Sequence, residues 1–192
     1  MNLLDQLAIN FDLPILDWIT EHLHCGVLDR LMPLITVLGN GGIFWILLSV
    51  AFMLIPKYRK AGFSMAIALL MGLLICNLSL KPLVARIRPY DFQLQNFGKS
   101  IPLLIAAPHD YSFPSGHTIA SFEAAVALLI RDRKLGMGAL ALAVLIAFSR
   151  LYLYVHYPTD VLASVVLGTL LAFIGTGIVN MINNFIQKRK TA

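Results

Sequence analysis

Long apolar segments, separated by short polar or charged stretches, dominate the pattern of the chain. Segments 61–80 and 161–187 contain no charged residue, and shorter apolar segments reach a similar length once their flanks are added. A helix needs about 20 predominantly apolar residues to cross the hydrocarbon layer of a membrane. The pattern therefore predicts membrane-crossing helices at 42–56, 61–80, 115–131, 135–153 and 159–187.

The amino-terminal part of the chain has a different pattern. In residues 1–25 acidic side chains interrupt the apolar ones, which predicts an amphipathic helical segment at the membrane surface. This segment lacks the basic start and continuous apolar stretch of a secretory signal, so we expect no cleavage. A short helix is predicted at 28–38, because the turn signal Gly-Asn-Gly-Gly follows at 39–42. Whether that helix spans the membrane decides where the amino terminus lies.

The composition agrees with an integral membrane protein. Of the 192 residues, 58% are hydrophobic and only 13% are charged, and the mean hydropathy is +0.78. We predict an all-α membrane bundle with about five to six membrane helices, preceded by the amphipathic segment. The prediction is a single domain over residues 1–192, with its helical core at 28–187.

The net charge of +5 comes largely from three basic clusters. Short cytoplasmic loops of membrane proteins carry an excess of Lys and Arg. Placing all three clusters in the cytoplasm makes the predicted crossings alternate without conflict, with the carboxyl terminus cytoplasmic and segment 81–115 outside. The clusters are Lys57, Arg59 and Lys60; Arg131, Arg133 and Lys134; and Lys188, Arg189 and Lys190.

Several other partners find no support in the sequence. No basic surface is interleaved with aromatic residues, so we expect no nucleic-acid partner. Cys25 and Cys76 are too few and too far apart for a metal or redox motif. The sequence leaves the oligomeric state open.

Polar residues that could take part in binding or catalysis occur in three motifs at the predicted outer ends of the crossings. In the first, Lys81 and Arg88 are seven residues apart, close to two helical turns, which predicts that they share one helix face. Pro82 suits the start of that helix and Pro89 its end. The two cations can bind one phosphoryl group, or they can merely anchor the chain at lipid headgroups. Arg86 and Arg88 are exceptions to the positive-inside rule, which suggests a task for them.

The second motif is Pro114-Ser115-Gly116-His117, which precedes an apolar helix. Ser115 is a good N-cap, and the free N–H groups of a helix N-terminus form an anion site that Gly116 leaves accessible. His117 stands in the first turn, where it can hand a proton to a leaving oxygen. The alternative is an ordinary cap beside an interfacial histidine.

The third motif is Ser149-Arg150-x5-His156-x3-Asp160. Pro158 suits the first turn of the last helix, so His156 lies just before that helix and Asp160 just inside it. The acid can reach back to the imidazole and fix its tautomer and orientation, as in a catalytic triad. The alternative is a His–Asp pair that only caps the helix.

The three motifs together resemble the pattern of the type-2 phosphatidic acid phosphatase superfamily, which includes vanadium-dependent haloperoxidases and bacterial membrane lipid phosphatases. The chain matches that pattern at every named position from Lys81 to Asp160. The resemblance covers most of the chain except its first 25 residues. It implies hydrolysis of a phosphate monoester or diphosphate through a phosphohistidine, without a metal or other cofactor.

The resemblance also implies a role for each matched residue. His156 is the implied nucleophile, Asp160 holds its ring and raises its nucleophilicity, and His117 protonates the leaving group and later helps to activate water. The phosphoryl oxygens would be bound by Lys81, Arg88, Ser115, Gly116 and Arg150.

A lipid phosphate or diphosphate in the bilayer is the expected substrate. Undecaprenyl diphosphate is the first expectation, because small bacterial members of the family often act on it at the outer face of the inner membrane. Phosphatidylglycerol phosphate and phosphatidic acid are rivals. The connection 90–111 is expected to overhang the site, either setting headgroup choice or serving as a plain loop.

Two other classes of protein are weaker alternatives. A channel or transporter would need polar residues through several crossings, yet apart from Glu123 and scattered Ser, Asn and Thr the crossings are apolar. Such a group is usually functional or paired, and for Glu123 we favour a bond to a neighbouring helix, or a protonated side chain, over a catalytic role. A non-catalytic binding protein of the same fold is disfavoured by the intact pair of His117 and His156.

Overall fold

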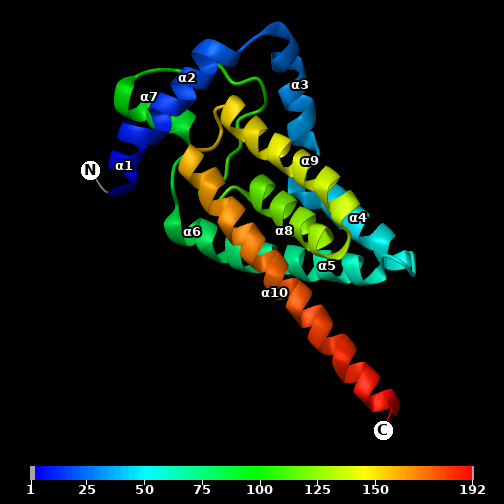
Figure 1. Cartoon of the computed structure of the whole chain (residues 1–192). Coiled ribbons are helices and arrows are strands. Elements are labelled where there is room, and N and C mark those ends of the chain that lie inside the picture. Colours follow the sequence, from blue (N-terminus) through cyan, green and yellow to red (C-terminus); the bar gives the residue numbers. More distant parts are fainter. Residues whose placement is uncertain (1–2, 192) are drawn as a thin grey trace.

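The computed structural model describes residues 3–191 and shows helices joined by turns and loops, with no strand in that range (Figure 1). The π-helical segments η1 and η3 continue directly into their neighbours, so α1 to α2 and α5 to α6 each form one longer helical segment. In chain order the elements are α1 (Leu3–Leu7), η1 (Ala8–Asp12), α2 (Leu13–Leu23), α3 (Gly26–Val37), the 3-10 turn η2 (Asn40–Gly42), α4 (Ile43–Leu54), α5 (Arg59–Gly72), η3 (Leu73–Leu80), α6 (Lys81–Val84), α7 (Pro89–Phe97), α8 (Gly116–Arg131), α9 (Arg133–Tyr152) and α10 (Pro158–Thr191).

The prediction of an all-α membrane bundle is confirmed. Helices α4, α5 with η3, α8, α9 and α10 occupy the predicted crossings, with ends within a few residues of the predicted ones. Helices α3 and α4 meet at a bend of 41° and form a possible fourth span. Three helical segments of the described chain are by themselves long and apolar enough to cross a membrane: Arg59–Phe97, Arg133–Tyr152 and Pro158–Arg189.

The turn predicted at 39–42 lies at that bend. Gly41 and Gly42 have φ angles of 57° and 66°, a left-handed conformation that glycine adopts without steric cost. The turn brings Asn40 toward the amino-terminal end of α8, where its side chain contacts His117.

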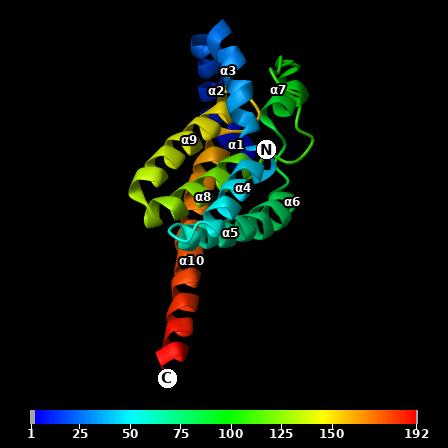
Figure 2. The same ribbon diagram turned by 90° about the vertical axis from the view of Figure 1, so that its right-hand side faces the viewer.

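Helix α8 lies at the centre of the bundle, packed against α5, α9 and α10 (Figures 1 and 2). Most of its side chains from Thr118 to Leu128 are buried, and several are small. Small residues let the backbones of neighbouring helices approach closely, which favours helix packing within a membrane. The small buried residues include Ser121, Ala124, Ala125 and Ala127.

The amino-terminal helical segment lies across the end of the bundle where α9 ends and α10 begins (Figure 1). It is amphipathic as predicted: one face is buried, while the other exposes residues such as Trp18. Residues 1 and 2 of this predicted segment lie outside the described range. The buried face packs against α7 and the α9–α10 connection in a cluster that includes Ala8, Leu13, Leu16, Phe92 and Tyr157.

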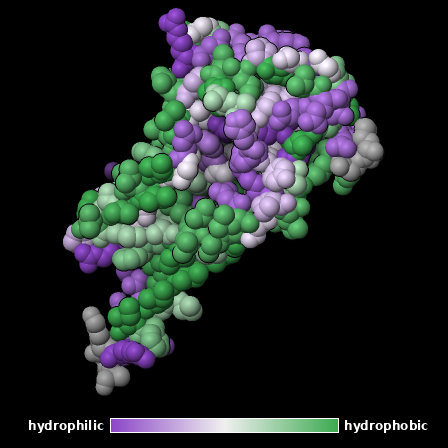
Figure 3. Space-filling model, turned by 180° about the vertical axis from the view of Figure 1, so that it is seen from behind, coloured by the Kyte–Doolittle hydropathy of each residue, from purple (hydrophilic) through white to green (hydrophobic). Residues whose placement is uncertain are grey.

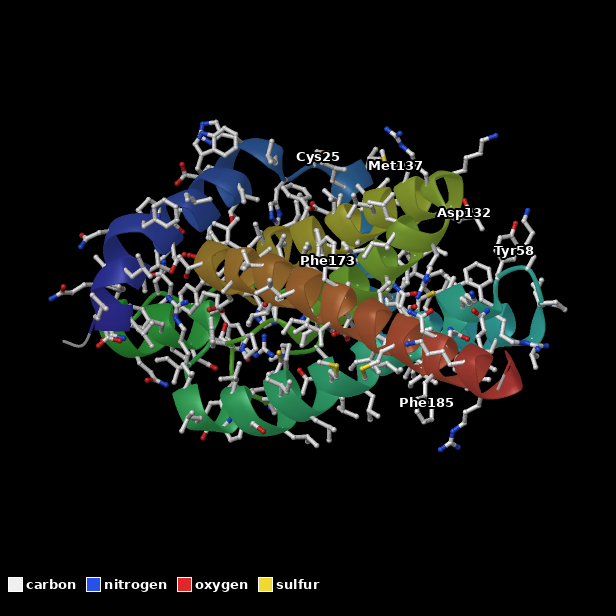
Figure 4. The ribbon with its side chains drawn as sticks, turned by 60° about the horizontal axis from the view of Figure 1, so that its bottom comes forward. Cys25, Tyr58, Asp132, Met137, Phe173 and Phe185 are labelled. Carbon is white, nitrogen blue, oxygen red and sulfur yellow. The ribbon has the colours of Figure 1, made fainter. Side chains whose placement is uncertain are left out.

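The surface divides into a hydrophilic end and a largely hydrophobic body. In Figure 3, hydrophilic side chains gather over the upper part of the molecule, where α1, α2 and α7 lie, and hydrophobic ones cover much of the lower part. The other end of the bundle carries the α4–α5 and α8–α9 turns. Tyr58 and Asp132, one from each turn, lie at the same end of the molecule (Figure 4). Two of the basic clusters flank these turns and therefore share one end.

Candidate active site

Residues of the three motifs surround one cavity of about 780 Å³ near the hydrophilic end of the bundle. They come from α6, the α6–α7 link, the start of α8, the end of α9 and the α9–α10 connection. Segments that are far apart in the sequence thus meet at one place. The motif residues that line the cavity are Lys81, Arg88, Gly116, His117, Arg150 and His156.

The path between Lys81 and Arg88 differs from the predicted one. The prediction of one helix that begins near Pro82 and ends at Pro89 is wrong. Helix α6 ends at Val84, the next residue Ala85 has a left-handed φ of 48°, and Pro89 is the first residue of α7. Pro82 lies inside a helical segment that continues from η3. The two cations still converge, because the chain changes direction between α6 and α7.

Asp110 joins the two cations of the first motif. Its Oδ2 accepts from Lys81 Nζ, and its Oδ1 accepts from Arg88 Nη2 at 2.5 Å. Its backbone oxygen accepts from Arg88 Nε at 2.8 Å. Burial opposes the charged form of Asp110, but the bond from Lys81 and the charge of Arg88 outweigh it and hold the pKa well below its usual range. The connection expected to overhang the site thus contributes a carboxylate to the cation pair.

Ser115 caps the amino terminus of α8 as predicted. Its Oγ accepts from the Thr118 backbone N–H at 3.5 Å and from Thr118 Oγ1 at 3.0 Å. The side chain is fully buried and does not line the cavity. His117 follows in the first turn and lines the cavity, with its Nε2 2.9 Å from Asn40 Oδ1.

His156 is almost fully buried, with its two ring nitrogens in different surroundings. Nε2 lies 3.3 Å from Arg88 Nη1, beside the cavity. Nδ1 lies 3.4 Å from Ser112 Oγ and 3.6 Å from Asp160 Oδ2. Burial, reinforced by the charges of Arg88 and Arg150, lowers the pKa of His156 well below its ordinary value. The ring is therefore neutral, which leaves a lone pair on one nitrogen.

Asp160 lies behind His156 rather than in the cavity lining, and several groups hold its carboxylate. Its Oδ1 accepts from Arg86 Nη1 at 2.6 Å. Its Oδ2 accepts from Ser112 Oγ at 2.5 Å and from the Tyr157 backbone N–H at 3.2 Å. Because Ser112 Oγ lies close to both Asp160 and His156 Nδ1, it bridges the acid and the imidazole.

Arg86 connects Asp160 to the amino-terminal segment. Its Nη2 donates to Asp12 Oδ2 at 2.7 Å, and its guanidinium stacks 3.7 Å from the ring centroid of Tyr157. Asp12 is fully buried and also accepts from the Thr159 backbone N–H at 2.9 Å. A cation between two buried carboxylates fixes the orientation of both, because each unpaired charge would be costly at this depth.

Arg150 reaches the cavity from the last turn of α9. Its Nη1 donates to Thr36 Oγ1 at 2.6 Å, whereas its buried Nε has no hydrogen-bond partner among the residues that the structure describes. An unsatisfied donor on a buried cation is expensive. A phosphoryl oxygen is a strong acceptor for such a donor, so this side chain is suited to bind an anion.

Four residues of this arrangement carried no motif that predicts their place. Arg86 had an indirect signal, because it departs from the positive-inside rule. Asp12, Ser112 and Asp110 reach the site only through contacts across many residues of sequence. Within residues 3–191, no group of three His, Cys, Asp or Glu side chains has the arrangement of a metal site.

A helical membrane bundle that brings a histidine pair to a cluster of cations defines a class of phosphatase, and the chain belongs to it: the sequence profile of the PAP2 superfamily matches residues 57–184. The resemblance drawn from the three motifs is thereby confirmed. The protein is a membrane lipid phosphatase, a hydrolase of phosphoric esters or anhydrides.

Individual relatives carry more specific names. The undecaprenyl-diphosphatase of Sulfolobus acidocaldarius is 31% identical over 152 residues, which cover 79% of this chain and 70% of that protein. Phosphatidylglycerophosphatase B of Bacillus subtilis is 32% identical over 187 residues, which cover 89% and 80%. The crystal structure of a PAP2 type phosphatidylglycerolphosphate phosphatase from Bacillus subtilis is similar with a TM-score of 0.71 at 26% identity, covering 94% of this chain and 89% of that one.

Proposed function

We propose that this protein hydrolyses undecaprenyl diphosphate to undecaprenyl phosphate and inorganic phosphate. In the first step, His156 Nε2 attacks the terminal phosphorus, and the bond from that phosphorus to the bridging oxygen breaks as His117 gives this oxygen a proton. In the second step, water gives a proton to His117 and attacks the phosphohistidine. Phosphate leaves, and both histidines return to their starting forms.

The surroundings of His156 support its role as the nucleophile. A neutral imidazole is needed for attack, and burial together with the neighbouring cations favours that form. Its Nε2 lies beside Arg88, another residue of the cavity lining, while Nδ1 lies beside Ser112 and Asp160. Asp160 would hold the ring in place and stabilise the positive charge that develops on it.

Three cations around the same cavity support binding of the phosphoryl group by Lys81, Arg88 and Arg150. Phosphoryl transfer depends mainly on positioning and on stabilising charge spread over the equatorial oxygens. Cations preorganised in a site with little water stabilise that charge more strongly than they would in bulk water. The backbone N–H of Gly116, at the start of α8, adds a donor, while Ser115 supports it as the cap.

The observation that carries the proposal is the position of this polar site at one end of a mostly apolar cavity. Beyond the cations, the cavity continues between α4, α5, η3 and α8. A lipid phosphate would place its headgroup among the cations and its chain along the apolar wall. That wall includes Ile46, Val50, Met53, Leu69, Leu70 and Leu73.

The names of the relatives support two substrates. The relative named undecaprenyl-diphosphatase supports undecaprenyl diphosphate as the substrate. The relative named phosphatidylglycerophosphatase B supports phosphatidylglycerol phosphate as the second candidate. We further propose that the site faces the outer side of a bacterial inner membrane and that the carboxyl terminus is cytoplasmic. The shared end of the basic clusters supports this orientation.

Phosphate release from the purified protein tests the proposal. We expect release from undecaprenyl diphosphate to exceed that from phosphatidylglycerol phosphate and phosphatidic acid in matched detergent, with inhibition by vanadate and no effect of a chelator. A preference for either glycerolipid would replace the proposed substrate, and loss of activity on chelation would contradict the mechanism.

The histidines provide a second test. His156→Ala is expected to abolish turnover while lipid binding survives, because the nucleophile is removed but the cations stay. His117→Ala removes positioned acid–base help and is expected to lower kcat by about a hundred- to ten-thousandfold. Full activity of His156→Ala in a stopped-time phosphate assay would rule out the phosphohistidine.

A further inference from the structure

The glycine-rich turn at 39–42 lies against His117, the proposed acid. Asn40 of this turn lines the cavity, and its Oδ1 is 2.9 Å from His117 Nε2. In the part of the chain that the structure describes, the His117 ring makes no other hydrogen bond. No step of the proposed reaction uses the turn, although it holds one of the two histidines on which that reaction depends.

The ring of His117 fills the space beside Gly39. A Cβ on this glycine would lie 2.6 Å from His117 Cδ2 and 2.9 Å from Ile146 Cγ2, closer than side chains approach. The φ of Gly39 is −91°, an angle that residues with a side chain also adopt in turns. The glycine is therefore required for space rather than for its backbone angle, and the imidazole packs directly on the turn.

The contact with Asn40 decides which nitrogen of His117 carries hydrogen. A carboxamide oxygen only accepts hydrogen bonds, so Nε2 is the donor. In the neutral ring Nδ1 is then the bare nitrogen, and in the protonated ring it carries the second proton. The Cδ2–Nε2 edge of the ring faces the turn, which leaves Nδ1 on the opposite edge.

A histidine that exchanges protons through one nitrogen benefits from an acceptor at the other. In catalytic triads such an acceptor fixes the tautomer and orientation of the ring and stabilises its protonated form. Ser112 and Asp160 lie beside one nitrogen of His156. Asn40 occupies the corresponding place beside His117, with an uncharged oxygen instead of a carboxylate.

We propose that Asn40 is a positioning residue that holds Nε2 of His117 and leaves Nδ1 to exchange protons. In the first step the proton on Nδ1 passes to the bridging oxygen as the bond from that oxygen to phosphorus breaks. In the second step Nδ1 takes a proton from the attacking water. The bond from Nε2 to Asn40 persists through both steps. The inference rests on the proposed function, because it assigns atoms to the acid of that reaction.

The tautomer of His117 is the first test. In 15N-histidine NMR of the detergent-solubilised protein at about pH 8, above the ordinary histidine value, we expect the Nε2–H form of His117. The signals are assigned with His117→Asn. Asn40→Leu should give a mixture of both tautomers, whereas Asn40→Asp keeps an acceptor oxygen and should keep the Nε2–H form. An Nδ1–H form in the unaltered protein overturns the inference.

Two phosphates with the same dodecyl tail test the role in proton transfer. The alkyl oxygen of dodecyl phosphate needs a proton to leave, whereas the aryl oxygen of a dodecyl-substituted nitrophenyl phosphate leaves readily without one. Asn40→Leu should lower the alkyl-to-aryl ratio of kcat/KM by about tenfold, the effect of one hydrogen bond. Asn40→Asp should retain most of the ratio. Gly39→Ala should lower it, because the added methyl group would displace the ring.

Ser121→Ala is the matched control. Ser121 Oγ accepts from Trp45 Nε1 at 2.9 Å, so this bond also ties α8 to a preceding helix but does not involve His117. A purely structural loss lowers kcat/KM for both phosphates alike, so we expect Ser121→Ala to leave the ratio unchanged.

An equal fall of the ratio in Ser121→Ala and Asn40→Leu overturns the inference. So does a rise in Asn40→Leu, which would mean that Asn40 competes with the leaving oxygen for the proton on Nε2. A ratio that falls in His117→Ala but not in Asn40→Leu overturns the inference and leaves the proposed function standing. A ratio that falls in neither variant overturns the acid role of His117 in the proposed function as well.

Discussion

If Lys81 and Arg88 bind the phosphoryl group as proposed, Asp110 is the carboxylate with which the substrate phosphate competes. It binds Lys81 and Arg88, yet its side chain is 54% exposed, so it can swing away from the cations. Asp110 therefore balances the positive charge of Lys81 and Arg88, and a phosphoryl group can still replace its carboxylate beside them. A phosphoryl group brings more negative charge and more acceptor oxygens than one carboxylate, which favours the exchange.

Removal of that charge is expected to strengthen phosphate binding. Asp110→Asn should lower KM and the concentration of vanadate needed for inhibition by about two- to fivefold, as expected for partly exposed ion pairs. Steady-state kinetics with vanadate titration provides the measurement. Asp91→Asn in α7 is the control, because Asp91 makes no ion pair with either cation. A rise in KM for Asp110→Asn would mean that this carboxylate mainly orders Arg88.

The protonation of His156 can be measured directly. Because its pKa is lowered, the ring should stay neutral as the pH falls through the ordinary histidine value of about 6.5. Loss of the neutral ring, and with it of the proposed nucleophile, is therefore expected only at lower pH. In 15N-histidine NMR of the detergent-solubilised protein, the His156 signals, assigned with His156→Asn, should still be those of neutral imidazole at about pH 5.5. Titration centred near pH 6.5 would contradict the described surroundings.

The sequence predicted the residues that lie in compact motifs better than those that support them. His117, Arg150 and His156, which the motifs singled out, all line one cavity, while their catalytic and binding roles stay predictions. Asp12 and Ser112 were not predicted, because a single Asp or Ser has no local pattern and their partners lie 74 and 44 residues away, at Arg86 and His156. Only the packing of distant helices brings such groups together.

At the scale of helices, the length of the apolar segments predicted where the helices lie. The local change of chain direction after Lys81 was not predicted. The crossings were predicted within a few residues because their ends coincide with charges, prolines and glycines. The helix from Lys81 to Arg88 was predicted wrongly, because Ala85 adopts a left-handed conformation that an alanine gives no reason to expect. The fold around it supplies the reason: Arg86 then reaches Asp12 and Asp160.

The amino-terminal helical segment is expected to influence catalysis through Asp12. Asp12→Asn weakens the bond to Arg86, and Arg86 then holds Asp160 less firmly. We therefore expect kcat to fall by at least about tenfold, or about 1.4 kcal/mol in the barrier. KM should change little, because Asp12 does not line the cavity. Phosphate-release kinetics separates the two parameters.

Asp17→Asn is the matched control for this segment. Asp17 holds the same helix through Lys99 and Tyr154 but has no bond to Arg86 or Asp160. We expect near-normal kcat for Asp17→Asn. Equal losses of kcat in both variants would show that Asp12 only docks the segment.

For the whole molecule, the proposed orientation can be tested by labelling with a membrane-impermeant maleimide. Lys99 lies at the hydrophilic end, and Lys134 lies at the end that carries the basic clusters. In a Cys25→Ser background, Lys99→Cys should react on intact cells and Lys134→Cys only after permeabilisation. The buried Cys76 should stay unlabelled in both cases. The reverse pattern would invert the orientation.

The contacts of Asp12 also set the time at which the enzyme can become active during its biosynthesis. Chains leave the ribosome amino terminus first, so Asp12 is made long before Thr159, its partner 147 residues further on. Until the start of α10 has emerged, Asp160 is absent and Asp12 lacks its contacts with Thr159. The site is therefore completed last, and under the proposed mechanism a nascent chain that stalls before this point holds no assembled nucleophile with which to attack the lipids around it.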